Sequence, residues 1–249
     1  MTPLPQARFS LDQTIDLPAL AEEFARCGRV QIAPFLETHV SAERLLQHVC
    51  RRKDWRVTIR TAADQPTVID RSDWEALRPP EREGLMKLAA PDDVDSFRYV
   101  FEEIVTVGPD FENREPGTFL GQFADFMSTA PVLDAIRRIT GATDIAGADL
   151  RATCYRSGHF LTRHNDTSTG MRRVAYVLGL TPRWRPEWGG MLMFHNERGD
   201  VELGLMPRMN VLNIFAVPQN HSVSLISSSA PDPRYAVTGW FRARTPGKS

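Results

Sequence analysis

Two histidines and one aspartate are the residues of this sequence whose types and spacing could hold a metal ion. His164 and Asp166 stand two positions apart, and in an extended chain such positions share one face. His221 follows 55 positions after Asp166, at the start of a predicted strand. Two imidazoles and one carboxylate leave the opposite coordination positions open, a donor set that suits iron(II) better than a structural zinc. Each histidine taken alone is also explained as a solvated residue or as one bonded to a backbone carbonyl.

Arg234 begins a segment, Arg-Tyr-Ala-Val-Thr-Gly-Trp-Phe-Arg, that alternates as a strand does. Arg234, Ala236, Thr238 and Trp240 then share one face. If that face points into a barrel, the buried guanidinium needs a partner, and a bidentate carboxylate is its best match. A bound dicarboxylate would meet this need, with its 2-oxo-acid end on the metal and its far end on Arg234. The alternative is an ordinary strand arginine that reaches solvent.

Several motifs around these residues resemble one enzyme family. In chain order they are Cys154-Tyr155, His164-Asn-Asp166, Gly189-Gly190, His221 and the Arg-Tyr-Ala-Val-Thr-Gly-Trp-Phe segment that starts at Arg234. Together they make residues 145–244 similar to the prolyl-4-hydroxylase-like branch of the iron(II)/2-oxoglutarate dioxygenases. Their common order and spacing are far more specific than any one of them.

The resemblance implies iron(II) on the His/Asp/His set, 2-oxoglutarate as co-substrate and ascorbate as a reductant. It implies that Tyr155 hydrogen-bonds 2-oxoglutarate and that Arg234 binds its distal carboxylate. Thr238 and Trp240 should line the co-substrate pocket. Because relatives that halogenate lack the carboxylate ligand, Asp166 indicates hydroxylation.

Two features depart from the family pattern. His221 and Arg234 lie 13 positions apart, slightly more than is usual, with residues 227–233 inserted as a loop. A second tyrosine that is often found in the family is replaced by Val177, and Tyr176 beside it should point to the opposite face. The assignment of Tyr155 is therefore firmer than that of any second hydroxyl contact.

Short strands separated by turn-forming residues dominate the chain after residue 143. Seven or eight strands so close together are typical of a sandwich, jelly roll or barrel. The candidates are residues 148–155, 159–164, 172–180, 190–195, 201–205, 210–215, 222–226 and 234–242. With the resemblance, they predict a mainly β protein with flanking helices, whose residues 144–249 form a double-stranded β-helix (a jelly roll, cupin-like).

Helical signals are stronger in residues 1–143. Helices are expected near residues 17–27, after Ser41, and over 117–127 and 131–140, with Gly28 and Gly141 placed to end two of them. Residues 29–33 and 55–60 read as strands, 64–95 as loops around short helices, and 97–107 is not assigned. We expect this region to buttress one sheet of the barrel, so that the chain forms one integrated domain.

Bulk composition excludes few functions. The chain has 249 residues, a formal net charge of -1 and three cysteines. This charge gives no general case for binding nucleic acid or acidic membranes, and an odd, sparse cysteine count argues against a disulfide framework or a structural zinc site. No apolar run could act as a signal peptide or cross a bilayer. A cytoplasmic location is the default expectation.

Other histidines and arginines give weaker signals. His39, His48, His159 and His195 are each expected to be structural or solvated, and His159 lies off the metal face by strand parity. A locally basic stretch should surround the mouth of the site, and it is either solvated surface or a contact for an anionic substrate. Its members are Arg156, Arg163, Arg172, Arg173, Arg183 and Arg185.

The sequence therefore predicts a non-haem iron(II) and 2-oxoglutarate-dependent dioxygenase that uses dioxygen to hydroxylate a C–H bond. A prolyl residue of a peptide or protein is the first expectation for the substrate, and a free amino acid or small metabolite is the alternative. A cupin-like metalloenzyme that does not use 2-oxoglutarate would keep the His/Asp/His set without needing Arg234. A binding module that has lost turnover is a third reading, and the intact ligand set argues against it.

Overall fold

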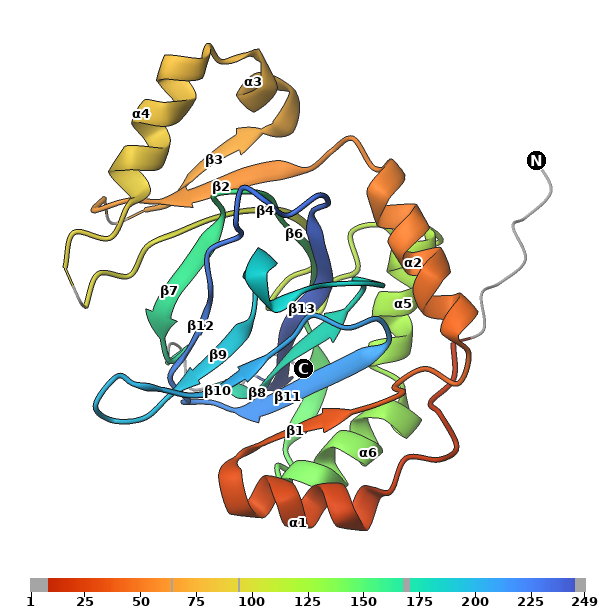
Figure 1. The fold of residues 1–249 in the computed structure, drawn as a ribbon. Helices are drawn as coiled ribbons and strands as arrows, with labels where there is room; N and C mark the ends of the chain where they lie inside the picture. Colours follow the sequence, from red (N-terminus) through yellow and green to blue (C-terminus); the bar gives the residue numbers. More distant parts are fainter. Residues whose placement is uncertain (1–8, 64, 94, 168–170, 245–249) are drawn as a thin grey trace, which may run out of the picture.

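The computed structural model describes residues 9–63, 65–93, 95–167 and 171–244. Within these residues, thirteen strands form one sheet in which every strand pairing is antiparallel. The sheet curls into a half-barrel, and the helices pack around it (Figure 1). The predicted fold class, mainly β with flanking helices, is confirmed.

The helices and strands have the following bounds. The helices are α1 (Leu17–Cys27), α2 (His39–Arg51), α3 (Arg71–Ala76), α4 (Pro79–Ala89), α5 (Phe119–Met127) and α6 (Ala130–Thr140), with a 3-10 turn at Pro186–Trp188. The strands before residue 143 are β1 (Arg29–Ile32), β2 (Arg56–Arg60), β3 (Thr67–Asp70) and β4 (Tyr99–Val107). The later strands are β5 (Ile145–Ala148), β6 (Leu150–Tyr155), β7 (Phe160–His164), β8 (Arg172–Gly179), β9 (Leu192–His195), β10 (Val201–Leu205), β11 (Val211–Ala216), β12 (His221–Val223) and β13 (Arg234–Ala243).

Two walls of the half-barrel face each other. One wall runs β1-β11-β8-β13-β6-β4, and the other runs β7-β12-β9-β10. Strand β4 joins them, since it pairs with β6 over most of its length and with β7 at Tyr99 and Val100. This is the two-walled arrangement expected of a jelly roll.

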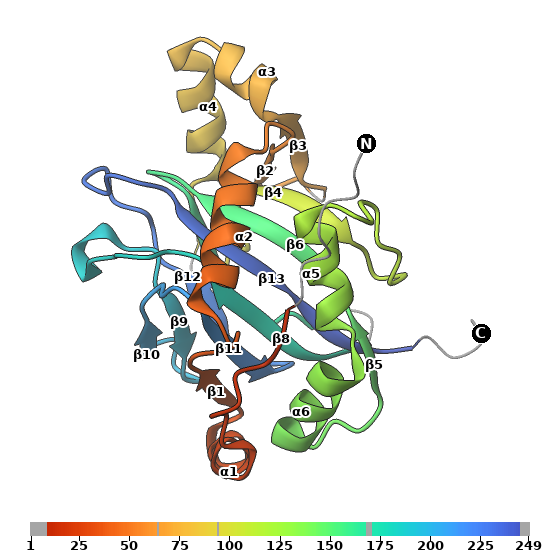
Figure 2. The ribbon, with the colours of Figure 1, turned by 90° about the vertical axis from the view of Figure 1, so that its right-hand side faces the viewer.

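Elements from the first 143 residues enlarge and cover the first wall. β1 pairs with β11, and β4 lies between β6 and β7. Helices α2, α5 and α6 cover the outer face of this wall (Figure 2). The main core fills the space between them, and representative members are Leu45, Phe123, Ile136, Ala152, Leu178 and Val237. None of the helices in the described ranges is long and apolar enough to span a membrane.

Strand alternation then decides which side chains face the interior of the barrel. In β13, Val237 and Phe241 pack into the core under the helices, whereas Arg234, Thr238 and Trp240 line the inner cavity. The same period of two separates core from cavity residues in β6 and β8. The first wall therefore has a closed apolar face and a polar, hollow face.

Local signals explain several element ends. Helix α6 has proline in its first turn and ends at Gly141, whose φ is 72°, as predicted. Residues 64–95, expected to be loops around short helices, hold β3, α3 and α4. The unassigned stretch 97–107 contains β4, most of whose residues are buried on both faces, so it lacks the alternation that marks a half-buried strand.

Candidate active site

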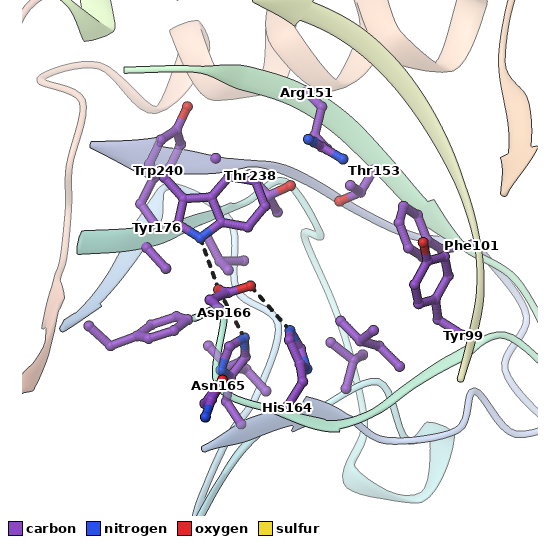
Figure 3. A pocket seen from close by; sticks show the side chains of 18 of the residues that line it. Tyr99, Phe101, Arg151, Thr153, His164, Asn165, Asp166, Tyr176, Thr238 and Trp240 are labelled. Atoms are coloured by element: carbon purple, nitrogen blue, oxygen red, sulfur yellow. Dashed lines mark hydrogen bonds and ion pairs between the residues drawn. The ribbon is translucent and has the colours of Figure 1, made fainter. Parts of the chain in front are cut away.

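His164, Asp166 and His221 converge at the inner end of the second wall. Strands β7 and β12 are antiparallel, and their register places His164 directly opposite His221. The Nε2 atoms of His164 and His221 lie 3.5 Å and 3.6 Å from the two Asp166 carboxylate oxygens. One ligand atom from each residue falls within 4.8 Å of the others, so together they could hold one metal ion. Figure 3 shows His164 and Asp166 together on one side of the cavity.

Backbone carbonyls fix the orientation of both imidazole rings. His164 Nδ1 lies 3.0 Å from the Thr162 carbonyl oxygen, and His221 Nδ1 lies 2.8 Å from that of Gln219. Each Nδ1 is thus the protonated nitrogen, because only an N–H can bond to a carbonyl. Each Nε2 is left with its lone pair directed toward Asp166, which is the usual arrangement around metal-binding histidines.

Asp166 adopts a backbone conformation that the sequence did not indicate. Strand β7 ends at His164, and Asp166 has a φ of 61°, in the left-handed region that costs most residues roughly 1–2 kcal/mol. Its side chain is held in place by Trp240, whose Nε1 donates to Oδ2 at 2.9 Å. The side chains of His164 and Asp166 are therefore brought together by a turn after the strand, rather than by strand alternation.

Charge states in this group suit a divalent cation. Burial alone would raise the pKa of the Asp166 carboxyl, but His164, His221 and Trp240 bring it down to about 2. Burial, with the nearby His164, lowers the pKa of His221 to about 4. At neutral pH Asp166 is ionised and His221 is neutral, as metal binding requires.

Arg234 occupies the opposite end of the cavity with no anionic partner in the described part of the chain. Only 3% of the residue is exposed, its Nε is buried without a hydrogen-bond partner, and its Cζ lies 5.1 Å from the centre of the Tyr155 ring. Burial lowers the pKa of the guanidinium, but an arginine stays protonated in proteins. Gly190 leaves room for this side chain, because a Cβ there would lie 3.0 Å from Arg234 Cδ.

The remaining sequence-predicted site residues share the same space. Tyr155, Thr238 and Trp240 all line a cavity of about 480 Å³ with the three candidate metal ligands and Arg234. Burial raises the pKa of Tyr155, so its hydroxyl is a neutral hydrogen-bond donor. Val177 and Tyr176 line the cavity as well, but the Tyr176 hydroxyl is engaged, because it donates to the Asp149 carbonyl oxygen.

An aromatic wall faces the three candidate metal ligands, and sequence reasoning missed it. Tyr99 and Phe101 project from β4, and Phe97 precedes that strand. The ring centroids of Phe97 and His164 are 5.0 Å apart, and Phe101 stacks on Tyr155 at 5.5 Å. Figure 3 shows Tyr99 and Phe101 across the cavity from His164. The three aromatic residues at every second position, 97, 99 and 101, were the available signal.

The predicted basic stretch divides into different environments. Arg172 lines the cavity, whereas several other members form ion pairs with carboxylates: Arg156 with Glu102, Arg163 with Asp95, Arg173 with Asp144 and Arg185 with Glu187. Arg151, which sequence reasoning did not single out, also lines the cavity. His39, His48, His159 and His195 do not line it.

Comparisons with known proteins agree with this geometry. The profile of the 2OG-Fe(II) oxygenase superfamily matches residues 150–242, which include every residue named above for the metal and for the dicarboxylate. A crystal structure of a Pseudomonas putida prolyl-4-hydroxylase is 22% identical, covers 92% of this chain and all of the other, and superposes with a TM-score of 0.57.

Two further solved structures share the fold. A Trichoplax adhaerens prolyl hydroxylase, in complex with a hypoxia inducible factor oxygen degradation domain peptide fragment, is 18% identical with a TM-score of 0.57, and the match covers 91% of this chain and 89% of that one. An oxidoreductase of the 2OG-Fe(II) oxygenase family from Burkholderia pseudomallei is 11% identical with a TM-score of 0.60, covering 97% of each chain. Residues 150–242 therefore form a 2OG-Fe(II) oxygenase domain, which supports a 2-oxoglutarate-dependent dioxygenase, and the chain has the fold of the prolyl-4-hydroxylases.

Proposed function

We propose that this dioxygenase hydroxylates a C–H bond of a prolyl residue in a peptide or protein, with iron(II) on His164, Asp166 and His221. The observation that carries the proposal is the convergence of these three ligands at one end of a cavity whose other end holds the buried Arg234. An isomerase or hydrolase built on the same metal set would have no use for that arginine.

The residues present fit both groups that the family requires. The lone pairs of two oriented imidazoles and one ionised carboxylate match iron(II). Arg234 offers a buried guanidinium with an unpaired Nε. Burying this charge costs free energy unless an anion pairs with it. Bound together with dioxygen, iron(II) and 2-oxoglutarate supply the oxidising power that turns C–H into C–OH and release succinate and carbon dioxide.

The chain itself supplies placement and exclusion of water. Arg234 binds the distal carboxylate of 2-oxoglutarate, the Tyr155 hydroxyl donates a hydrogen bond to the co-substrate, and Thr238 closes the side of its pocket. Trp240 holds the Asp166 carboxylate through its Nε1–H, so that the ligand keeps one orientation when the metal binds. These fixed contacts reduce the reorganisation needed before reaction.

The aromatic wall supports a cyclic, mainly apolar substrate. Phe97, Tyr99 and Phe101 present ring faces or edges to the cavity, and a pyrrolidine ring packs well against such surfaces. The Trichoplax adhaerens relative is in complex with a peptide, which is consistent with a peptide reaching this cavity from outside. A free amino acid or small metabolite is the second candidate, favoured by the arginines discussed below.

Three further proposals accompany this one. Residues 1–143 and 144–249 act as one integrated unit, which the pairing of β1 with β11 and of β4 with β6 supports. The enzyme acts in the cytoplasm, which the free thiols of Cys27, Cys50 and Cys154 support. Ascorbate keeps the metal reduced, and this proposal rests on the family resemblance alone.

A substrate screen tests the proposed reaction. Purified enzyme with iron(II), 2-oxoglutarate and air is offered capped prolyl peptides and free amino acids, and products are analysed by mass spectrometry. We expect a gain of one oxygen atom on a prolyl ring, with one succinate formed per product. Oxygen gain on a non-prolyl substrate would refute the prolyl assignment, and a product with no succinate would refute the reaction.

A further inference from the structure

Among the described residues, two arginines besides Arg234 line the cavity, and both lie against Trp240. The Cζ of Arg172 lies 3.6 Å from the centre of the Trp240 ring, and that of Arg151 lies 5.3 Å from it. Arg172 also donates from Nη1 to the Asp166 carbonyl oxygen at 3.1 Å. Figure 3 shows Arg151 reaching from β6 toward the same space as Trp240 and Asp166.

Strand register separates this pair from the arginine assigned to 2-oxoglutarate. In the β6–β13 ladder, Tyr155 is opposite Arg234 and Arg151 is opposite Thr238. Four residues of strand correspond to roughly 13 Å. Because Trp240 bonds to Asp166, the arginine pair lies at the metal end of the cavity, and the distal carboxylate of 2-oxoglutarate cannot reach both ends.

Charges around the cavity leave one positive charge without a counterpart. Four arginines contribute: Arg151, Arg172, Arg234 and Arg242. Three carboxylates balance them: Glu103 with Arg151 at 2.9 Å, Asp149 with Arg242 at 3.1 Å, and Asp166 at the metal. The two positive charges of iron(II) and the two negative charges of 2-oxoglutarate cancel each other. The loaded site among the described residues is therefore one charge positive.

Arg172 and Arg151 retain donors for an incoming anion. Arg172 Nε is buried without a hydrogen-bond partner, and the Asp166 oxygen nearest to Arg172, 3.6 Å away, belongs to the carboxylate assigned to the metal. Arg151 uses Nη1 on Glu103, and a guanidinium has five N–H donors in all. A carboxylate is the anion whose two oxygens match this geometry best.

We propose that Arg151 and Arg172 form a subsite for a carboxylate of the hydroxylated substrate. The subsite rests on the proposed function, because the metal and 2-oxoglutarate define which part of the cavity is left for substrate. The carboxylate anchors one end of the substrate beside Trp240, and the apolar body lies between the metal and the aromatic wall of Phe97, Tyr99 and Phe101. Its source is either the α-carboxylate of a free amino acid or an acidic side chain next to the target residue of a peptide.

Acid and amide pairs test the subsite directly. The protein is loaded anaerobically with iron(II) and 2-oxoglutarate, and binding is followed by the change in the metal-to-ligand charge-transfer band and in tryptophan fluorescence. The probes are the standard L-amino acids with their amides, and capped prolyl tripeptides ending in Glu or Gln. We expect at least one acid to bind about tenfold to a hundredfold more tightly than its neutral partner, the ratio typical of a charge-assisted contact.

Which probe pair shows the preference identifies the source of the carboxylate. A preference among the amino acids points to an α-carboxylate, and one confined to the tripeptides points to an acidic side chain. If no acid in either set binds more tightly than its neutral partner, the subsite does not exist. Absence of the charge-transfer band on loading would instead refute the proposed function, so the two failures are distinguishable.

Variants test whether the two arginines cause the preference for an acid over its neutral partner. Arg172→Gln and Arg151→Gln should each remove most of the preference, whereas Arg172→Lys should keep part of it. Arg173→Gln is the matched control, because Arg173 is the next residue of the same strand and binds Asp144. A preference that survives in both glutamine variants overturns the proposal. Loss of the band in Arg172→Gln would also overturn it, since Arg172 would then support the metal ligand rather than the substrate.

Discussion

Replacing Arg234 with leucine shows whether this buried arginine binds 2-oxoglutarate or stabilises the fold. The side chain is almost fully buried, and its Nε is unpaired in the described structure. If it serves 2-oxoglutarate, the variant loses one partner of a buried ion pair, which costs about 3–5 kcal/mol. Every 1.4 kcal/mol is a factor of ten, so the Kd for 2-oxoglutarate should rise roughly a hundredfold to a few thousandfold.

The effect on the unliganded protein should have the opposite sign or be absent. A buried guanidinium without an anion is unfavourable, and leucine fills part of the same space with no charge to desolvate. We therefore expect the midpoint of thermal unfolding without 2-oxoglutarate to be unchanged or higher in Arg234→Leu. An arginine with a structural role would give a lower midpoint.

Thermal unfolding with and without co-substrate measures both effects. With anaerobic iron(II) and 2-oxoglutarate at 100 times its Kd, the wild type should gain about 2.7 kcal/mol, or roughly 5–11 °C for a chain of this size. At the same concentration Arg234→Leu should gain almost nothing, and Arg185→Leu, at an exposed arginine paired with Glu187, should behave as wild type. An undiminished 2-oxoglutarate shift in Arg234→Leu would refute the assignment.

Three other changes test separate parts of the site. Tyr155→Phe should raise the Kd for 2-oxoglutarate about fivefold, the value of one neutral hydrogen bond. The control Tyr176→Phe should leave this Kd unchanged while lowering the free energy of unfolding by about 1 kcal/mol. Equal Kd values in titrations of the two variants would contradict the role of Tyr155. Gly190→Ala should weaken 2-oxoglutarate binding in the same titration, because φ is +66° and the new Cβ would lie 2.5 Å from Ile226 Cδ1 and 3.0 Å from Arg234 Cδ, whereas Gly84→Ala, with nothing within 4 Å, should bind normally. Asp166→Ala should lose iron in an equilibrium dialysis assay while circular dichroism stays native, and retention of iron would show that this carboxylate is not a ligand.

The inner face of β13 was predictable because one face of this strand packs against the apolar core and the other faces the polar cavity. Val237 and Phe241 pack under the helices, and Arg234, Thr238 and Trp240 face a polar cavity. In such a strand, core residues and cavity residues occupy alternate positions of the sequence. The candidate metal ligands were proposed from residue type and the family resemblance, since nothing local to His221 indicates that β12 pairs with β7.

Other parts of the site could not be predicted, for identifiable reasons. β4 is covered on both faces, so apolar and polar residues do not alternate along it, and the aromatic residues at 97, 99 and 101 alone did not identify a strand. The prediction that His164 and Asp166 share a face assumed an extended chain at Asp166, but its φ is 61°. Arg172 is followed directly by Arg173, and its contacts with Trp240 and the Asp166 carbonyl oxygen, which the sequence does not reveal, distinguish it from that neighbour, which binds Asp144.

Anaerobic titration with 2-oxoglutarate shows whether the iron(II)-loaded protein binds this co-substrate at His164, Asp166 and His221. We expect a weak visible charge-transfer band that saturates at one 2-oxoglutarate per chain, is absent when His221 is replaced by alanine, and requires a far higher 2-oxoglutarate concentration in Arg234→Leu. A wild-type protein that binds iron at these residues yet develops no band would show that they do not form a 2-oxoglutarate-dependent iron site.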